Sequence, residues 1–203
     1  LQEADGDSVE TPREIPLERG DRGTWSVAVP GDRHGDRYRY RFEHYGRLDE
    51  TPDIHAFASS PDERWSIVAD LDRLAPEGWG GIPAPVLAQP TDEVIYEIHV
   101  RDFSIADVDC PPERRGTYLG LVEGSDGETA TGDRDGVSSG LDHLVDLGIT
   151  AVHLMPVHDF SAGIDEYNWG YWTAFFNVPE ANFATDPEDS LAAIAELRTA
   201  VQG

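Results

Sequence analysis

Apolar and polar residues alternate along the first third of the chain. The alternation runs through residues 25–29, and it is strict over residues 37–42, where Tyr38, Tyr40 and Phe42 share one face and three arginines share the other. This pattern predicts half-buried strands, and PGDRHGD between them is typical of a hairpin connection. With a third strand predicted at residues 65–68, we expect residues 1–75 to form part of an antiparallel β-sandwich.

The pattern changes after a proline-rich stretch. Four prolines fall within residues 76–92, which therefore cannot continue a sheet or helix and are predicted to be a linker. VIYEIHV, residues 94–100, is a nearly continuous apolar run of the kind found in buried parallel strands. ITAVHLM, residues 149–155, predicts a second such strand.

Two helices are predicted beside these strands. Ser138 or Ser139 can cap the first helix, and Gly148 ends it. Asp186 followed by Pro187 predicts the start of the second helix. The apolar residues at helical spacing are Leu141, Leu144 and Val145 in the first helix, and Leu191, Ile194, Leu197 and Val201 in the second.

The connections between these elements differ greatly in length. The first helix reaches the next strand through little more than Gly148, whereas the strand-to-helix loops occupy residues 101–137 and 156–185. Both long loops follow the carboxyl ends of parallel strands, which is the asymmetry of a (β/α)-barrel enzyme. A doubly wound sheet shares it, but the absence of a glycine-rich phosphate loop after either strand argues against a nucleotide site.

The charge of the chain limits its partners. The formal net charge is -25, and all 15 basic residues are arginine. Such a charge repels nucleic acid and anionic membranes, so we expect neither as a partner. It also favours a halophilic origin with salt-dependent folding, because the Debye length falls to about 3 Å at 1 M salt; an acidic mesophilic protein, or a GC-rich genome that disfavours lysine, is the alternative.

Cysteine content and hydropathy add little. Cys110 is the only cysteine, which excludes an intrachain disulfide and gives no zinc-ligand spacing. No apolar stretch approaches the length of a signal peptide or membrane helix. We expect a soluble protein, cytoplasmic or secreted, or one whose targeting segment lies outside this sequence.

Several motifs resemble a known family. IYEIHVRDFS (95–104), GLDHLVDLGITAVHLMPVHDF (140–160), and YNWGY (167–171) with NVPEANFATDP (177–187) are similar to the first strand, first helix, second strand and second loop of α-amylase-superfamily glycoside hydrolases. Within glycoside hydrolase family 13 they most closely resemble type I pullulanases. Residues 23–42 and 51–71 are similar to the latter half of the glucan-binding β-sandwich, a carbohydrate-binding module, that precedes the barrel in these enzymes.

The resemblance implies a multidomain fold and an internal fragment of a longer enzyme. Residues 1–75 would be a partial β-sandwich, residues 76–92 a linker, and residues 93–203 the first βαβα portion of a (β/α)8 barrel. It also implies a starch or glycogen debranching activity that cleaves α-1,6 bonds, with pullulan, starch or glycogen as the glucan. Pullulanases usually continue YNWGY with Asp-Pro, whereas Trp172 and Thr173 stand here, closer to ordinary amylases. An amylase or isoamylase, or an inert glucan-binding relic of a truncated gene, is therefore the alternative.

No catalytic residue is assigned. Retaining hydrolysis of a glycosidic bond needs two carboxyl groups about 5 Å apart. In the family that this chain resembles, both lie on barrel strands beyond the fourth, so the 203-residue chain alone is expected to be inactive.

Metal binding has weak support in the sequence. Asp126, Asp133 and Asp135 in the run 124–136 could ligate calcium, but the run fits no calcium-loop spacing and a solvated acidic loop is the favoured interpretation. We expect no metal site in this chain and no certain cofactor, and we leave calcium open for the full-length enzyme.

The aromatic stretch around residue 171 supplies the candidate binding site. By the resemblance, Tyr171 stacks on a sugar ring, because a pyranose presents an apolar C–H face that fits a flat aromatic ring. Asn168, Trp169 and Trp172 are further candidates for the same pocket. Loop packing is the alternative for each of the four, and it is the favoured interpretation for Phe175, Phe176 and Phe183.

The other chemically interesting residues favour structural roles. His99 and His153 are predicted to lie within strands as hydrogen-bonded structural histidines, while His158, after the second strand, stays open. For Arg101 and Asp102 we expect an adjacent ion pair or a loop anchor rather than contact with sugar.

Overall fold

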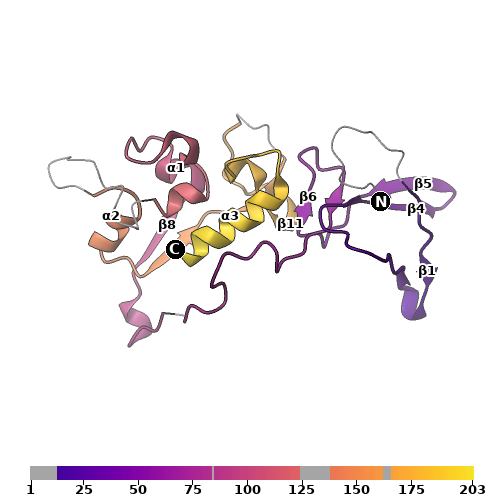
Figure 1. Cartoon of the computed structure of the whole chain (residues 1–203), viewed down its shortest axis with the longest axis horizontal. Helices are drawn as coiled ribbons and strands as arrows, with labels where there is room; N and C mark the ends of the chain where they lie inside the picture. Colours follow the sequence, from indigo (N-terminus) through magenta and orange to yellow (C-terminus); the bar gives the residue numbers. More distant parts are fainter. Residues whose placement is uncertain (1–12, 84, 124–137, 162–165) are drawn as a thin grey trace.

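The structure is a computed structural model that describes residues 13–83, 85–123, 138–161 and 166–203. It is elongated, with small antiparallel sheets at one end and a parallel strand pair with two short helices at the other (Figure 1). The long helix α3 (Ser190–Gln202) lies between the two ends. Within the described residues the fold is rich in sheet, and its strands do not close into a barrel.

The described part of the N-terminal third consists of short strands in separate antiparallel sheets. β1 pairs with β2, β4 pairs with β5, and β7 lies between β3 and β6. The elements are β1 (Glu18–Arg19), η1 (Asp21–Gly23), β2 (Trp25–Ser26), β3 (Arg37–Tyr38), β4 (Tyr40–His44), β5 (Arg47–Thr51), β6 (Ala58–Ser59) and β7 (Ser66–Ile67). The third predicted strand, at residues 65–68, is confirmed as β7.

The predicted hairpin between residues 25–29 and 37–42 is wrong. β2 pairs with β1, and β3 pairs with β7 instead. The polar connection does not close a hairpin because its side chains bond to nearby backbone: the Arg33 guanidinium donates to the Pro30 carbonyl, and the Asp32 carboxylate accepts from the His34 N–H. The true hairpin of this region is β4–β5, which turns at Tyr45 and Gly46, both with positive φ as a type I′ turn requires.

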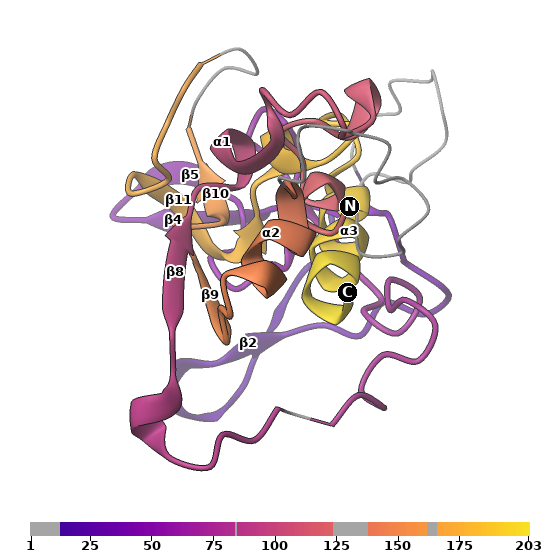
Figure 2. The same cartoon turned by 90° about the vertical axis from the view of Figure 1, so that its left-hand side faces the viewer.

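The C-terminal two thirds contain the predicted strands and helices. β8 and β9 pair in parallel, with Ile95 opposite Ala151, and α2 and α3 lie on one side of this pair (Figure 2). The elements before α3 are η2 (Pro90–Asp92), β8 (Ile95–Ile98), α1 (Val100–Ser104), η3 (Pro112–Arg114), η4 (Leu119–Leu121), α2 (Gly140–Asp146), β9 (Ala151–Leu154), β10 (His158–Phe160), β11 (Thr173–Pro179) and η5 (Ala181–Phe183).

Two details of the helices differ from the sequence prediction. α3 begins at Ser190, because the Asp189 carboxylate accepts the free N–H groups of the first turn while the Asp186 carboxylate closes a separate local turn. In α2, Leu144 is buried as predicted, but Val145 is 68% exposed. Val145 therefore does not belong to the inner face of α2.

Helix α3 packs into both apolar clusters of the described structure. Residues at spacings of three and four on one side of the helix, Ala193, Leu197 and Ala200, join the cluster formed with Ile98, Val100, Tyr118 and Phe183. Leu191 and Ile194, on another side, join the cluster formed with Ala58, Ile67, Leu71 and Leu74. Helix α3 therefore connects the three-stranded sheet β3–β7–β6, which we call the N-terminal sheet, to the parallel strand pair.

Polar contacts continue this connection at the β10–β11 hairpin. The buried Ser59 hydroxyl of β6 donates to the Asp159 carboxylate of β10 at 3.2 Å, and the Ser161 hydroxyl donates to the Glu63 carboxylate at 2.7 Å. We call these four residues the seam. Figure 1 shows β6 beside β11 at this point.

Two buried carboxyl groups at the β10–β11 hairpin have raised pKa values: Asp159 of the seam and Glu180, which directly follows β11. Burial raises the pKa of Asp159 to about 6, and the Glu63 charge adds to this while the Ser59 hydrogen bond opposes it. Burial likewise raises the pKa of Glu180 to about 7, against the lowering effect of the Asn182 and Phe160 N–H groups. In the unfolded chain both groups release their protons at lower pH, so the stability that they contribute is complete below about pH 4 and is lost as pH rises towards 7.

We predict that Asp159→Asn makes the free energy of unfolding less dependent on pH. A pKa raised by about two units corresponds to about 3 kcal/mol at most, so replacing the carboxyl group should remove on the order of 2 kcal/mol of the loss between pH 4.5 and 7.5. Urea denaturation of the parent and variant chains at both pH values measures this. Equal pH dependence in the two chains would show that Asp159 titrates normally.

Candidate functional site

Residues 167–172, which we call the aromatic loop, are anchored to α1, the helix that follows the first parallel strand. The Tyr167 hydroxyl donates to the Asp102 carboxylate at 2.6 Å, a bond that raises the pKa of Tyr167. Asp102 also lies 3.9 Å from the neighbouring Arg101 guanidinium. Both predicted roles of this residue pair, adjacent ion pair and loop anchor, are confirmed.

His99 forms a second anchor. Its ring is 6% exposed and caps α1, with Nδ1 accepting from the Asp102 N–H and Nε2 3.0 Å from the Asn168 carbonyl oxygen. These partners assign the proton to Nε2, which then donates to that carbonyl. The predicted structural, hydrogen-bonded role is confirmed, but the predicted place within a strand is wrong, because β8 ends at Ile98 and His99 begins the turn into the helix.

A tight turn then brings the chain to the surface. The Asn168 side-chain oxygen accepts from the Gly170 N–H at 2.8 Å. Gly170 has φ +83°, and a Cβ there would lie 2.5 Å from the Pro156 carbonyl oxygen, so only glycine fits. Beyond this turn Tyr171 and Trp172 are 63% and 82% exposed.

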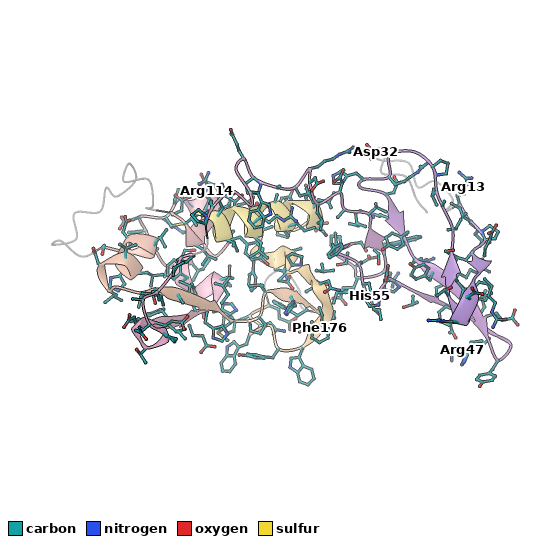
Figure 3. All side chains as sticks on the ribbon, turned by 90° about the horizontal axis from the view of Figure 1, so that it is seen from below. Arg13, Asp32, Arg47, His55, Arg114 and Phe176 are labelled. Carbon is teal, nitrogen blue, oxygen red and sulfur yellow. The ribbon has the colours of Figure 1, made fainter. Side chains whose placement is uncertain are left out.

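These two rings line an open pocket of about 650 Å³ on the outer face of the β10–β11 hairpin. The pocket combines aromatic rings with a few polar groups. Its lining residues are Pro156, His158, Ser161, Tyr171, Trp172, Thr173, Ala174 and Phe176. Phe176 is labelled in Figure 3, on β11 between the two ends of the molecule.

The pocket contains two of the four binding residues predicted from the sequence, Tyr171 and Trp172. Asn168 does not line it, because its side-chain oxygen and its carbonyl both hold the loop. Trp169 is 60% exposed on the same loop but also lies outside the pocket lining.

The prediction that Phe176 belongs to the loop core is wrong. Phe176 is 70% exposed, whereas Phe175 and Phe183 are buried as predicted. Residues 174–176 are exposed, buried and exposed along β11, but Val178 is buried although it lies two residues after Phe176, so alternation along this segment contains no signal that could have identified Phe176.

His158 lines the pocket, whereas His153 does not. His158 begins β10, lines the pocket, and has its ring centroid 5.9 Å from that of Phe176. His153 lies within β9 as predicted, away from the pocket lining. His158 is a pocket residue that the sequence left undecided.

The part of the chain that the structure describes contains neither a candidate metal site nor a helix that could cross a membrane. There, His, Cys, Asp and Glu side chains form no group of three or more suited to a metal ion. The calcium candidates Asp126, Asp133 and Asp135 lie outside the described residues. None of the helices among the described residues is long and apolar enough to cross a membrane.

The chain has clear relatives, although no family model matches it. It is 36% identical to pullulanase from Bacillus subtilis over 92% of this chain and 25% of that protein, and 31% identical to chloroplastic pullulanase 1 from Arabidopsis thaliana over 95% of this chain and 23% of that protein. The structure superimposes on pullulanase from Paenibacillus barengoltzii in complex with maltohexaose and α-cyclodextrin with a TM-score of 0.84, 39% identity, and coverage of 99% of this chain and 31% of that one.

The match is thus nearly complete for this chain but partial for its relatives, of which it spans about a quarter to a third. Sequence identity and structural similarity agree, and both extend over the N-terminal sheets as well as the parallel strand pair. This chain belongs to the pullulanase family and corresponds to a part of its longer members.

Proposed function

We propose that the chain is part of a debranching glycoside hydrolase that cleaves α-1,6-glucosidic bonds in pullulan, starch or glycogen. The pocket carries this proposal: exposed aromatic rings stand beside hydroxyl and imidazole groups on the outer face of β10–β11. A sugar ring offers apolar C–H faces and polar hydroxyl edges, which this combination fits. The oligosaccharide complex of the Paenibacillus relative adds support.

Within this pocket we assign the stacking face to Tyr171. Trp172 and Phe176 would supply further apolar contact, and His158 and Ser161 are polar groups available to sugar hydroxyls. Asn168 would contribute indirectly by holding the turn. Trp169, exposed on the same loop, would contact a glucan longer than the pocket.

We also propose the domain organisation that the motifs imply. Residues 1–75 would be part of a glucan-binding β-sandwich, residues 76–92 a linker, and residues 93–203 the first portion of a (β/α)8 barrel. The parallel β8–β9 pair supports this, because Ile95, Tyr96 and Val152 are 60%, 41% and 43% exposed. Parallel sheets are normally covered on both faces, so further strands and helices of the longer protein would cover these side chains.

The proposal assigns binding, not chemistry, to this chain. Hydrolysis needs a nucleophile and an acid/base carboxyl group, which the family resemblance assigns to later barrel strands. Asp159 and Glu180 have raised pKa values but are buried and bonded to Ser59 and to backbone N–H groups. Neither lines the pocket.

Tyr171→Ala is predicted to weaken the binding of maltotetraose. If stacking is worth about 1 to 3 kcal/mol, the value for a nucleic acid base on an aromatic ring, the dissociation constant should rise about 5- to 150-fold. Tyr171→Phe keeps the ring and should stay within about 2-fold of the parent chain. Isothermal titration calorimetry measures both dissociation constants, and the melting temperature of each variant is the control. If the alanine variant has a lower melting temperature but binds maltotetraose as tightly as the parent chain, Tyr171 is a packing residue.

We further predict that the 203-residue chain releases no reducing sugar from pullulan or amylose. The reason is the missing carboxyl pair rather than failure to bind. A reducing-sugar assay on purified chain, with the full-length Bacillus subtilis relative as positive control, tests this. Activity that co-purifies with the chain would contradict it, and faster release from amylose than from pullulan would favour the amylase alternative.

A further inference from the structure

The two faces of the β10–β11 hairpin serve different purposes. Its outer face lines the pocket with His158, Ala174 and Phe176, while Asp159 and Phe175 are buried on the opposite face. That opposite face packs on β6 of the N-terminal sheet (Figure 1). The N-terminal sheet therefore lies directly behind the pocket.

One contact crosses from the N-terminal sheet to the pocket lining itself. Ser161 lines the pocket, and its hydroxyl donates to the Glu63 carboxylate at 2.7 Å, across 98 residues of sequence. Ser59 adds a buried bond to Asp159, two residues before Ser161. The segment at the pocket edge is thus held from behind by two side chains of the N-terminal sheet.

The turn that carries Glu63 is held by its own hydrogen bonds. The Ser60 hydroxyl donates to the Asp62 carboxylate at 2.5 Å and accepts from the Trp65 N–H at 3.0 Å, and the Ser60 carbonyl accepts from the Glu63 N–H at 2.8 Å. Glu63 adopts φ +57°, an uncommon backbone conformation for a residue other than glycine. These bonds hold that backbone conformation, and the Glu63 side chain reaches Ser161 from it.

We propose that Glu63 is a positioning residue for glucan binding: through Ser161 it fixes the edge of the pocket on the neighbouring hairpin. This inference rests on the proposed function of the pocket. It gives the N-terminal sheet a part in binding at the pocket without direct contact between that sheet and the sugar. The electrostatics agree with this arrangement, since the Glu63 charge also raises the pKa of the adjacent Asp159.

The test is a set of maltotetraose titrations by isothermal calorimetry on the 203-residue chain. Glu63→Ala removes the acceptor and should raise the dissociation constant about 2- to 10-fold, the range of one hydrogen bond. Glu63→Gln keeps an acceptor oxygen and should restore most of the affinity. Glu77→Ala, the matched control on the segment beside the end of α3, should bind as the parent chain does.

A double-mutant cycle separates positioning from general loss of stability. Ser161→Ala should weaken binding at least as much as Glu63→Ala, because it also removes a hydroxyl available to the sugar, and the double variant should bind as Ser161→Ala does, because the bond to Glu63 is already broken there. Fully additive losses, or unchanged affinity in Glu63→Ala, would overturn the inference while leaving the pocket intact. If the parent chain binds no maltotetraose, the proposed pocket fails, and this inference fails with it.

Discussion

The packing of α3 is the constraint on which the rest of this structure depends. A helix of thirteen residues presents Ala193, Leu197 and Ala200 to one apolar cluster and Leu191 and Ile194 to the other. Its polar residues extend the second contact. Arg198 donates to the Leu71 carbonyl and lies 5.3 Å from the Trp79 ring, and the Gln202 amide donates to the Glu77 carbonyl. Short two-residue strands such as β6 and β7 gain little from their own pairing, so burial against α3 is what stabilises them.

The packing of α3 also determines where the pocket lies. Once α3 and β6 meet, the β10–β11 hairpin has one face against the N-terminal sheet and one face free. The free face lines the pocket, and the anchored loop brings Tyr171 and Trp172 to it. Burial raises the pKa values of the Asp159 and Glu180 carboxyl groups, because the charged form loses its hydration and the hydrogen bonds to each group offset only part of that loss.

The sequence predicted the regular elements better than their pairing. Nearly continuous apolar runs identified the strands at residues 94–100 and 149–155, because both faces of a parallel sheet are buried, and apolar residues at helical spacing identified both helices, because one face of each helix is buried. The hairpin at residues 30–36 failed, since Arg33 and Asp32 bond to local backbone and no local rule reveals that β3 pairs with β7. The β10–β11 hairpin was missed inside a segment interpreted as one long loop.

The residues of the candidate site were likewise predicted only in part. Tyr171 was selected because the motif resemblance carries information about its loop position, and Trp172, which departs from the motif, was selected as its aromatic neighbour; both line the pocket. Phe176 and Ser161 were missed because their roles depend on which face of a hairpin is covered by a distant strand. Contacts such as Glu63 to Ser161 join residues 98 positions apart, and a single sequence contains no signal for them.

The central claim is that α3 unites the N-terminal sheet and the pocket hairpin into one folded unit. Amide hydrogen exchange of the Ile194→Ala chain tests it most directly, because this truncation removes buried contacts worth about 2–5 kcal/mol between α3 and the N-terminal sheet, away from the β10–β11 hairpin. We predict an equal loss of protection free energy in β6–β7 and in β10–β11. Loss confined to β6–β7, with β10–β11 as protected as in the parent chain, would contradict the claim.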